Sequence, residues 1–221
     1  MLTVSKYIAS FLEKKKISNV PIFQGGAIMN IINEIGKSKK IKFYCPYHEQ
    51  ALAMQIDAMA RLGIISSGFV TSGPGATNLL TGILCSYYDS VPGVYFTGQV
   101  GQYHIQKKDT VRQRGFQETD VISIFKNATK YCVQVKKAED IKYELEKSFH
   151  LSQNGRPGPC ILDVPYNIQI SSIDPKKLKS YVPPKIKSNP RKFEIVLKKI
   201  KSKKKILVIA GGGVRHSNQI Q

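Results

Sequence analysis

The chain has 221 residues, 42% of them hydrophobic, so it is long enough to bury a full core. Its formal net charge is +19, but the lysines are spread along the chain and the densest basic stretch, residues 176–205, has few aromatics, so nucleic-acid binding is not expected. The sequence contains neither an apolar run of membrane-spanning length nor a signal-peptide layout at residues 1–16, which predicts a soluble cytoplasmic protein without membrane contacts.

Hydrophobic periodicity alternates between the helical and the strand type along residues 3–164. The helical pattern covers residues 3–15, 28–36, 51–62, 76–88, 120–125 and 138–151. Short apolar runs predict strands over 41–45, 64–71, 94–97 and 160–164, and residues 20–23 form a further apolar run. This alternation predicts an α/β fold, an open parallel sheet with helices on both faces.

The composition changes after residue 165. We expect residues 1–170 to form the α/β domain, and residues 171–190, rich in Pro, Lys and Ser, to be a linker. Residues 191–221 carry a short amphipathic helix at 193–200 and an apolar run at 205–210 that reads as the first strand of a second, incomplete α/β domain. Its Gly211-Gly212-Gly213 is an incomplete dinucleotide fingerprint.

Cysteine and histidine usage indicates no metal site. Cys45, Cys85, Cys132 and Cys160 lie far apart in apolar segments, without C-x-x-C spacing, and are expected to be buried reduced thiols. The histidines are scattered, and no Ser-His-Asp pattern emerges.

Three polar motifs each follow a predicted strand, where open α/β sheets bind their ligands. They are His48-Glu49-Gln50, Thr71 to Asn78, and Thr97-Gly98-Gln99-Val100. Glu49 precedes an alanine-rich helix, so its carboxylate either lies in an apolar pocket or caps the helix at the surface. Gln99 either reaches a ligand through its amide or caps a turn.

The Gly73-Pro74-Gly75 turn lets the backbone approach a ligand closely. It precedes a predicted helix, so an anion site and a tight structural turn are both consistent with it. It matches neither G-x-G-x-x-G nor a Walker loop.

Together these motifs resemble the N-terminal, pyrimidine-binding domain of thiamine-diphosphate enzymes, most closely the acetolactate synthase group. The likeness covers residues 3–169, and residues 205–217 resemble the opening of that family's central domain. The motifs that carry it, in chain order, are Gly25-Gly26-Ala27-Ile28, His48-Glu49-Gln50-Ala51, Thr71 to Asn78, Asp89-Ser90-Val91-Pro92, Thr97-Gly98-Gln99-Val100, Phe116-Gln117-Glu118-Thr119-Asp120, Thr129-Lys130, and Gly155-Arg156-Pro157-Gly158-Pro159 with Asp163-Val164-Pro165.

The resemblance implies roles for individual residues. In the family, a glutamate at the position of Glu49 contacts N1′ of the cofactor's aminopyrimidine and so promotes loss of the thiazolium C2 proton. The other positions that match the cofactor site are Gly26, Ala27, Pro74, Asn78 and Gln99. Those that match the substrate entrance are Phe116, Gln117 and Lys130.

The resemblance also implies an activity: decarboxylation of a 2-keto acid such as pyruvate on thiamine diphosphate, and transfer of the two-carbon unit to a second carbonyl, in branched-chain amino acid biosynthesis. The family holds the diphosphate and Mg²⁺ in a C-terminal domain whose Gly-Asp-Gly to Asn-Asn motif this sequence lacks. The isolated chain is therefore expected to be inactive, the full-length form to be a homodimer or tetramer, and FAD dependence stays open. The alternatives are another thiamine-diphosphate keto-acid decarboxylase or lyase, and a non-catalytic half-protein that docks a C-terminal partner.

Two departures from the acetolactate synthase pattern bear on the second substrate. Gln24 stands where these enzymes usually have proline before the double glycine. The loop from Tyr103 to Arg114 is unusually basic, which favours an anionic acceptor or one larger than pyruvate.

Overall fold

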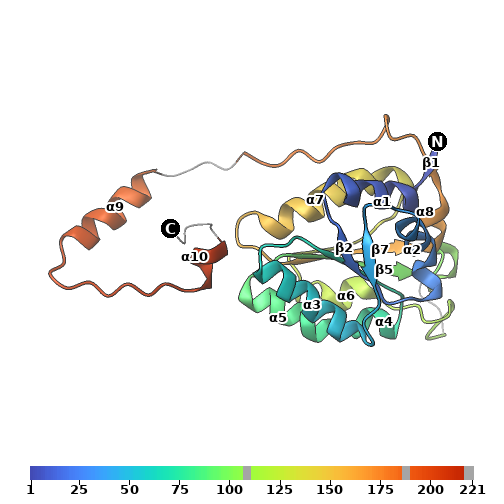
Figure 1. The fold of residues 1–221 in the computed structure, drawn as a ribbon, viewed down its shortest axis with the longest axis horizontal. Coiled ribbons are helices and arrows are strands. Elements are labelled where there is room, and N and C mark those ends of the chain that lie inside the picture. Colours follow the sequence, from blue (N-terminus) through green and yellow to red (C-terminus); the bar gives the residue numbers. More distant parts are fainter. Residues whose placement is uncertain (107–110, 186–189, 217–221) are drawn as a thin grey trace. The chain divides into compact units, whose positions relative to one another are not determined.

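The computed structural model describes residues 1–106, 111–185 and 190–216 and divides the chain into two units, Met1–Tyr181 and Val182–Gln221 (Figure 1). The first unit contains a parallel sheet whose strand order is β4-β5-β7-β6. These strands are β4 (Ser67–Val70), β5 (Gly93–Gln99), β6 (Tyr131–Gln134) and β7 (Pro159–Pro165). The predicted open parallel sheet is confirmed.

Shorter strands extend and flank this sheet. A parallel pair, β2 (Asn19–Pro21) and β3 (Lys42–Tyr44), adjoins β4 through a bridge between Ile22 and Phe69. Another pair, β1 (Leu2–Thr3) and β8 (Ser172–Ile173), is antiparallel. Residues 172–173 therefore pack with the N-terminus, and the first unit extends past the expected boundary at residue 170.

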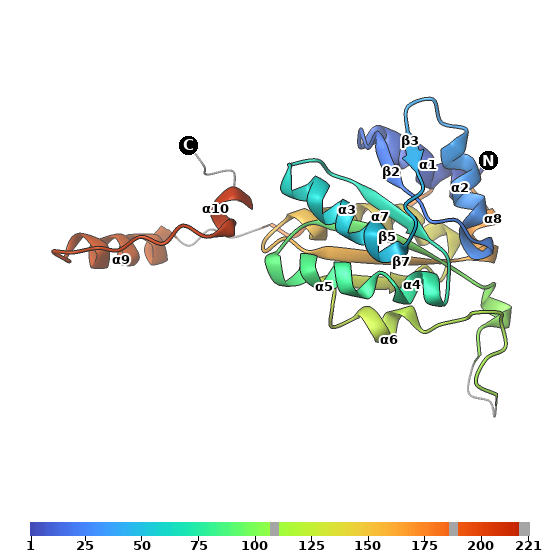
Figure 2. The same cartoon turned by 60° about the horizontal axis from the view of Figure 1, so that its bottom comes forward.

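Helices cover both faces of the sheet (Figure 2). One face packs against α1 (Val4–Lys14), α2 (Met29–Gly36), α7 (Ile141–Gln153) and α8 (Tyr166–Ile170). The other packs against α3 (Glu49–Arg61), α4 (Pro74–Thr77), α5 (Leu80–Asp89) and α6 (Val121–Phe125). Strand β5 serves both cores because successive side chains of a strand alternate: Val94 and Phe96 enter the first cluster and Tyr95 the second. The described residues of this unit also form 3-10 turns, at Gly26–Ile28, Gln102–His104 and Ala138–Asp140.

The second unit differs from the expectation. It contains α9 (Pro190–Lys201) and α10 (Gly212–His216), whereas the apolar run at 205–210 is extended but unpaired. The predicted strand is therefore absent from this part of the described chain. A strand is defined by hydrogen bonds to a neighbour, and no second strand is described in residues 190–216 to supply them.

The cysteines are free thiols, but the expectation that all four are buried is wrong. Cys160 is buried and Cys132 half-buried, while Cys45 and Cys85 are exposed. Cys45 directly follows β3, whose residues are all exposed at the edge of the sheet, so an apolar run there did not mean burial. Burial raises the pKa of Cys160 to about 12, which leaves its thiol unreactive.

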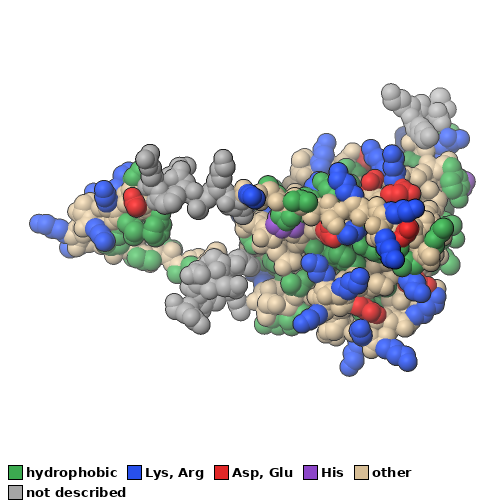
Figure 3. All heavy atoms as spheres, turned by 90° about the horizontal axis from the view of Figure 1, so that it is seen from above, with side chains coloured by type: hydrophobic (Ala, Val, Ile, Leu, Met, Phe, Trp, Pro, Cys, Tyr) green, Lys and Arg blue, Asp and Glu red, His purple; other side chains and the backbone are tan. Residues whose placement is uncertain are grey.

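Lysine and arginine side chains are scattered among acidic and apolar ones on the face of the first unit drawn in Figure 3. Over the described residues, no helix combines the length and the apolar character that crossing a membrane requires.

Candidate functional site

Glu49 is buried, with 5% of its surface exposed, at the first residue of α3. Its position is set by His48, whose Nδ1 accepts a hydrogen bond from the backbone N–H of Gln50 at 3.1 Å and so caps the helix. Asn78 donates from Nδ2 to Glu49 Oε2 at 3.0 Å. Of the two alternatives for Glu49, the structure shows the buried carboxylate.

The Thr71 to Asn78 segment lies beside this carboxylate. A Cβ atom at Gly75 would clash with Thr71 Cγ2, at 2.7 Å, and would lie 3.5 Å from Glu49 Oε1, so glycine lets α4 pack closely against Thr71 beside the carboxylate. Gly73 has φ of 60°, a left-handed conformation that favours glycine, and lets the chain turn sharply into α4. Pro74 is exposed at the start of that helix.

The loop before α2 packs against the same segment. A Cβ at Gly25 would lie 2.4 Å from Thr71 Cβ, and the Ala27 N–H donates to Thr71 Oγ1 at 3.3 Å. A Cβ at Gly26 would meet no atom within 4 Å, so Gly26 faces open space. The structure thus brings Gly26 and Ala27 to the ends of β4 and β5, where the Thr71 to Asn78 and Thr97 to Val100 motifs lie.

The end of β5 packs against the same loop, at Ala27. A Cβ at Gly98 would lie 2.3 Å from the backbone oxygen of Ala27, a contact that only glycine allows without movement of the chain. The Ala27 oxygen also accepts a hydrogen bond from Gln169 Nε2 at 2.6 Å. Gly98 therefore fixes the distance between β5 and the Gly26–Ala27 loop.

Gly98→Ala is expected to lower the free energy of unfolding by about 2 kcal/mol, because overpacking a backbone contact forces the loop to shift. Gly26→Ala, whose Cβ would enter open space, is the matched control and should change stability by less than about 0.5 kcal/mol. Urea unfolding followed by circular dichroism measures both. Equal stability of the two variants would contradict the close approach.

Gln99 is 2% exposed, and protein groups occupy its amide. Nε2 donates to the Thr119 oxygen at 2.8 Å and lies 3.4 Å from Asp163 Oδ2, while Oε1 accepts from the Val100 N–H at 3.0 Å. The structure thus shows the capping alternative for this side chain. Gln99 lies at the carboxyl end of β5, opposite Pro165 of β7.

Asp163 is a functional candidate that the sequence reasoning missed. It is fully buried on β7, opposite Thr97, and accepts hydrogen bonds from Thr97 Oγ1 at 2.7 Å and Gln134 Nε2 at 2.8 Å. Burial is the main cause that raises its pKa from 3.8 to about 6, against the opposing effect of the hydrogen bonds. An aspartate inside the apolar run Cys160 to Val164 was the available signal, since a buried charge requires a specific environment.

The two predicted entrance residues Phe116 and Gln117 lie beside the Gly73 turn. A Cβ at Gly73 would lie 2.8 Å from Gln117 Cβ, and Gln117 itself has φ of 56°. Phe116 is 81% exposed. These positions are next to the motif cluster, on its outer side.

Lys130 is not brought to this cluster. It immediately precedes β6, and its N–H donates to the oxygen of Pro159 at the beginning of β7. Because the strands are parallel, their beginnings lie at the edge of the sheet opposite to the end that carries Gln99. The structure therefore does not support a shared site for Lys130 and Glu49.

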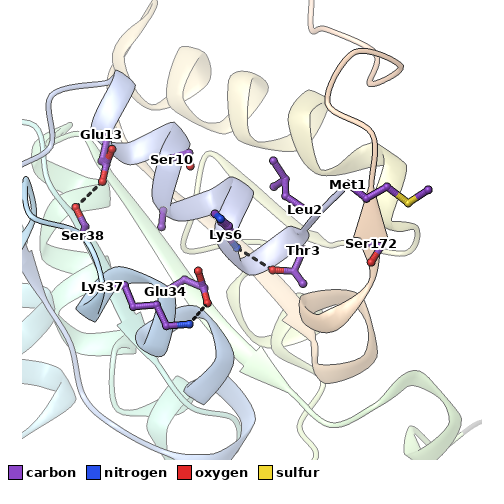
Figure 4. A pocket seen from close by; sticks show the side chains of 11 residues that line it. Met1, Leu2, Thr3, Lys6, Ser10, Glu13, Glu34, Lys37, Ser38 and Ser172 are labelled. Atoms are coloured by element: carbon purple, nitrogen blue, oxygen red, sulfur yellow. Dashed lines mark hydrogen bonds and ion pairs between the residues drawn. The ribbon is translucent and has the colours of Figure 1, made fainter.

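A pocket of about 500 Å³ lies elsewhere, beside α1, α2 and β8 (Figure 4). Its carboxylates are engaged: Glu34 pairs with Lys37 at 2.6 Å, and Glu13 accepts from Ser38 at 2.5 Å. None of the motif residues lines it. The described residues also contain no group of three or more Asp, Glu, His or Cys that could hold a metal ion.

Comparison with known proteins gives a consistent result. The family model described as "Thiamine pyrophosphate enzyme, N-terminal TPP binding domain" matches residues 2–124. The chain is 34% identical over 220 residues to the acetolactate synthase large subunit of Haemophilus influenzae, covering 96% of this chain and 37% of that protein. It is 31% identical over 221 residues to the large subunit of Lactococcus lactis, covering 98% of this chain and 37% of that protein.

A plant relative shows the same relation. The chloroplastic acetolactate synthase of Arabidopsis thaliana is 34% identical over 221 residues, covering 95% of this chain and 32% of that protein. The chain thus spans only about a third of the length of the curated relatives it matches.

Proposed function

Because this chain belongs to the thiamine pyrophosphate enzyme family, with an acetolactate synthase-like N-terminal TPP binding domain, we propose that it supplies the aminopyrimidine pocket of an enzyme that decarboxylates pyruvate and transfers the two-carbon unit to a second carbonyl. The observation that carries the proposal is the buried Glu49 carboxylate, which accepts a hydrogen bond from Asn78 and lies beside the closely packed Gly75. A heteroaromatic ring with a basic nitrogen fits such a carboxylate, and the residues present therefore suit the cofactor.

Thiamine diphosphate, when bound, supplies a carbon nucleophile and an electron sink for the decarboxylation. In this proposal Glu49 holds and transfers the proton at the pyrimidine nitrogen N1′, which requires a carboxyl group shielded from water. Asn78 fixes the direction of that carboxyl through its 3.0 Å hydrogen bond. Pro74 lines the ring at the start of α4, and Gly26 and Ala27 border the side on which a substrate reacts.

Gln99 has a supporting part in this proposal. Its amide hydrogen bonds to Thr119, Asp163 and Val100 hold the end of β5 in place, so that Gln99 shapes the pocket wall. Phe116 and Gln117 stand on the outer side of the Gly73 turn, where a substrate would approach.

The finer features of the enzyme are those that the family resemblance implies, and they belong to the same proposal. The diphosphate and Mg²⁺ would be held by a segment outside this chain, the active form would be a homodimer or tetramer, and the enzyme would act in branched-chain amino acid biosynthesis in the cytoplasm. FAD would bind, if at all, to the central domain.

Product analysis tests the proposed reaction in a full-length form that contains this chain. With [3-¹³C]pyruvate and thiamine diphosphate, NMR should show labelled acetolactate as the main product. Acetaldehyde without acetolactate would favour a simple decarboxylase, and unreacted pyruvate would favour the non-catalytic alternative. The chain of residues 1–221 alone, measured in parallel, should leave pyruvate unchanged.

The loop from Tyr103 to Arg114 bears on the identity of the second substrate, the acceptor. Its residues 107–110 lie outside the described residues. The loop is tied to the Phe116 segment, because Glu118 accepts from the N–H of Gly115 at 2.9 Å and of Gln106 at 3.2 Å. Its basic residues and Gln24 lead us to propose an anionic or larger acceptor. Kinetics with a panel of keto acids and aldehydes would refute this if pyruvate alone served as both donor and acceptor.

A further inference from the structure

A second pocket, of about 470 Å³, lies at the edge of the sheet opposite to Glu49. It is lined by Tyr87 and Tyr88 from α5, by Lys130 before β6, and by Arg156 and Gly158 before β7. This volume falls in the range of small-molecule sites. The motifs Thr129-Lys130 and Gly155 to Pro159, which the proposed reaction does not use, thus meet at one hollow.

Among the described residues that line this pocket there are two cations and no carboxylate. In the part of the chain that the structure describes, the ion pairs join Lys37, Lys40 and Arg61 to carboxylates, and none includes Lys130 or Arg156. Burial lowers the pKa of Lys130, as expected for an ammonium group that loses water without gaining an anion. An anion in the pocket would offset that cost.

Both cations are held in position by uncharged groups. Arg156 donates from Nε to Ser90 Oγ at 2.7 Å and from Nη2 to the Tyr88 oxygen at 3.3 Å. Lys130 donates from Nζ to the backbone oxygen of Asn154. These bonds satisfy carbonyls at the ends of α5 and α7, but they leave the other guanidinium N–H groups and the remaining ammonium protons available. The donors are therefore preorganised, which reduces the entropy cost of binding.

The pocket also has an apolar wall. Tyr87 and Tyr88 pack edge to face, with ring centroids 5.7 Å apart, and both line the hollow. Pro157 adds a further apolar surface. A ligand that carried only charge would leave this wall unused.

We propose that this pocket binds a small organic anion, with a phosphate or carboxylate group between Lys130 and Arg156 and an apolar part against Tyr87 and Tyr88. The site is separate from the proposed reaction, because it opens at the beginnings of the strands rather than at their ends. It is a binding site on the first unit for a ligand other than the cofactor.

Calorimetric titration of the full 221-residue chain tests the proposal, with phenyl phosphate and benzoate as probes and benzyl alcohol as the uncharged analogue. At least one anion should bind saturably at physiological salt, and the stronger of the two identifies the anionic group. Lys130→Gln and Arg156→Gln should each weaken binding about tenfold, as expected for loss of a charge-assisted hydrogen bond. Lys137→Gln, which removes an exposed charge beyond the other end of β6, should leave it unchanged.

Two outcomes would overturn the proposal: no saturable binding of either anion, or equal weakening by Lys137→Gln, which would indicate general attraction to a strongly basic chain. If a variant fails to fold, ¹⁵N NMR of the wild-type chain keeps the test decisive. The anion should shift the Arg156 Nε–H and Gly158 N–H signals, whereas benzyl alcohol should not. Shifts confined to other parts of the chain would equally contradict the site.

Discussion

Glu49→Gln, in a full-length form that contains this chain, is expected to slow exchange of the C2 hydrogen of bound thiamine diphosphate by about 10²–10⁴-fold, the usual contribution of a general acid–base group. Glutamine has the same shape and can still accept the hydrogen bond from Asn78, so the fold should be retained. What the variant loses is a carboxyl that can hold a proton at N1′. Hydrogen–deuterium exchange followed by quenched-flow NMR measures the rate.

The cofactor affinity separates this role from a binding role. We expect the dissociation constant of thiamine diphosphate to change less than about tenfold in Glu49→Gln, because one hydrogen bond to a ring contributes little compared with the whole cofactor. Glu139→Gln, which alters an exposed carboxylate, is the control and should leave both quantities unchanged. Exchange at the wild-type rate in Glu49→Gln would disprove the role assigned to Glu49.

Asp163→Asn is expected to remove a pH-dependent contribution of about 3 kcal/mol to the free energy of unfolding. This magnitude follows from the pKa of Asp163, which burial raises from 3.8 to about 6. Because the folded-state pKa lies above the unfolded one, the folded protein binds the proton more tightly between these values. The stabilisation from this proton is fully present below the unfolded pKa and is lost as the pH rises through the folded pKa. The wild type should therefore lose stability relative to the variant over that window.

The variant should fold, because an asparagine amide can accept from Gln134 and donate to the Thr97 hydroxyl in place of the carboxylate. Urea unfolding of both proteins between about pH 4 and pH 8 measures the difference. Asp140→Asn, at an exposed position, controls for the loss of one acidic group. A stability difference between wild type and Asp163→Asn that stays constant with pH would contradict the raised pKa.

Most of the fold could be predicted from periodicity alone. The helices at α1, α2, α3 and α7 and the strands at β4, β5 and β7 have strong repeats, because one face of each helix and both faces of each central strand are buried. Strand β6 was missed, since Tyr131 to Gln134 is a half-buried edge with mixed polarity. An edge strand has only one neighbour, so its sequence is less constrained.

The unpredicted strand β6 also explains why Lys130 lies away from the expected substrate entrance. The family resemblance assigns Lys130 to the substrate entrance, but which edge of the sheet a residue occupies depends on whether it precedes or follows a strand. Once β6 is recognised, Lys130 stands before it, on the edge away from Gln99. The residue order of a motif does not contain that information.

The site itself was partly accessible from sequence. Strand-end motifs correctly indicated that Glu49 and Asn78 share one edge, because parallel strands bring their carboxyl ends together. The Gly26–Ala27 loop, which packs against Thr71 and Gly98 at that edge, was indicated only by the family resemblance. The environment of each side chain was not accessible. Whether Glu49 is buried, and whether the amide of Gln99 bonds to Asp163, depends on contacts between residues far apart in the chain.

A crystal structure of a full-length form with thiamine diphosphate and Mg²⁺ would show whether Glu49 and Asn78 form an aminopyrimidine pocket. We expect the Glu49 carboxylate to lie within hydrogen-bond distance of N1′, with Pro74 and Asn78 beside the ring. A pyrimidine ring bound elsewhere, with Glu49 contacting only protein groups, would contradict it.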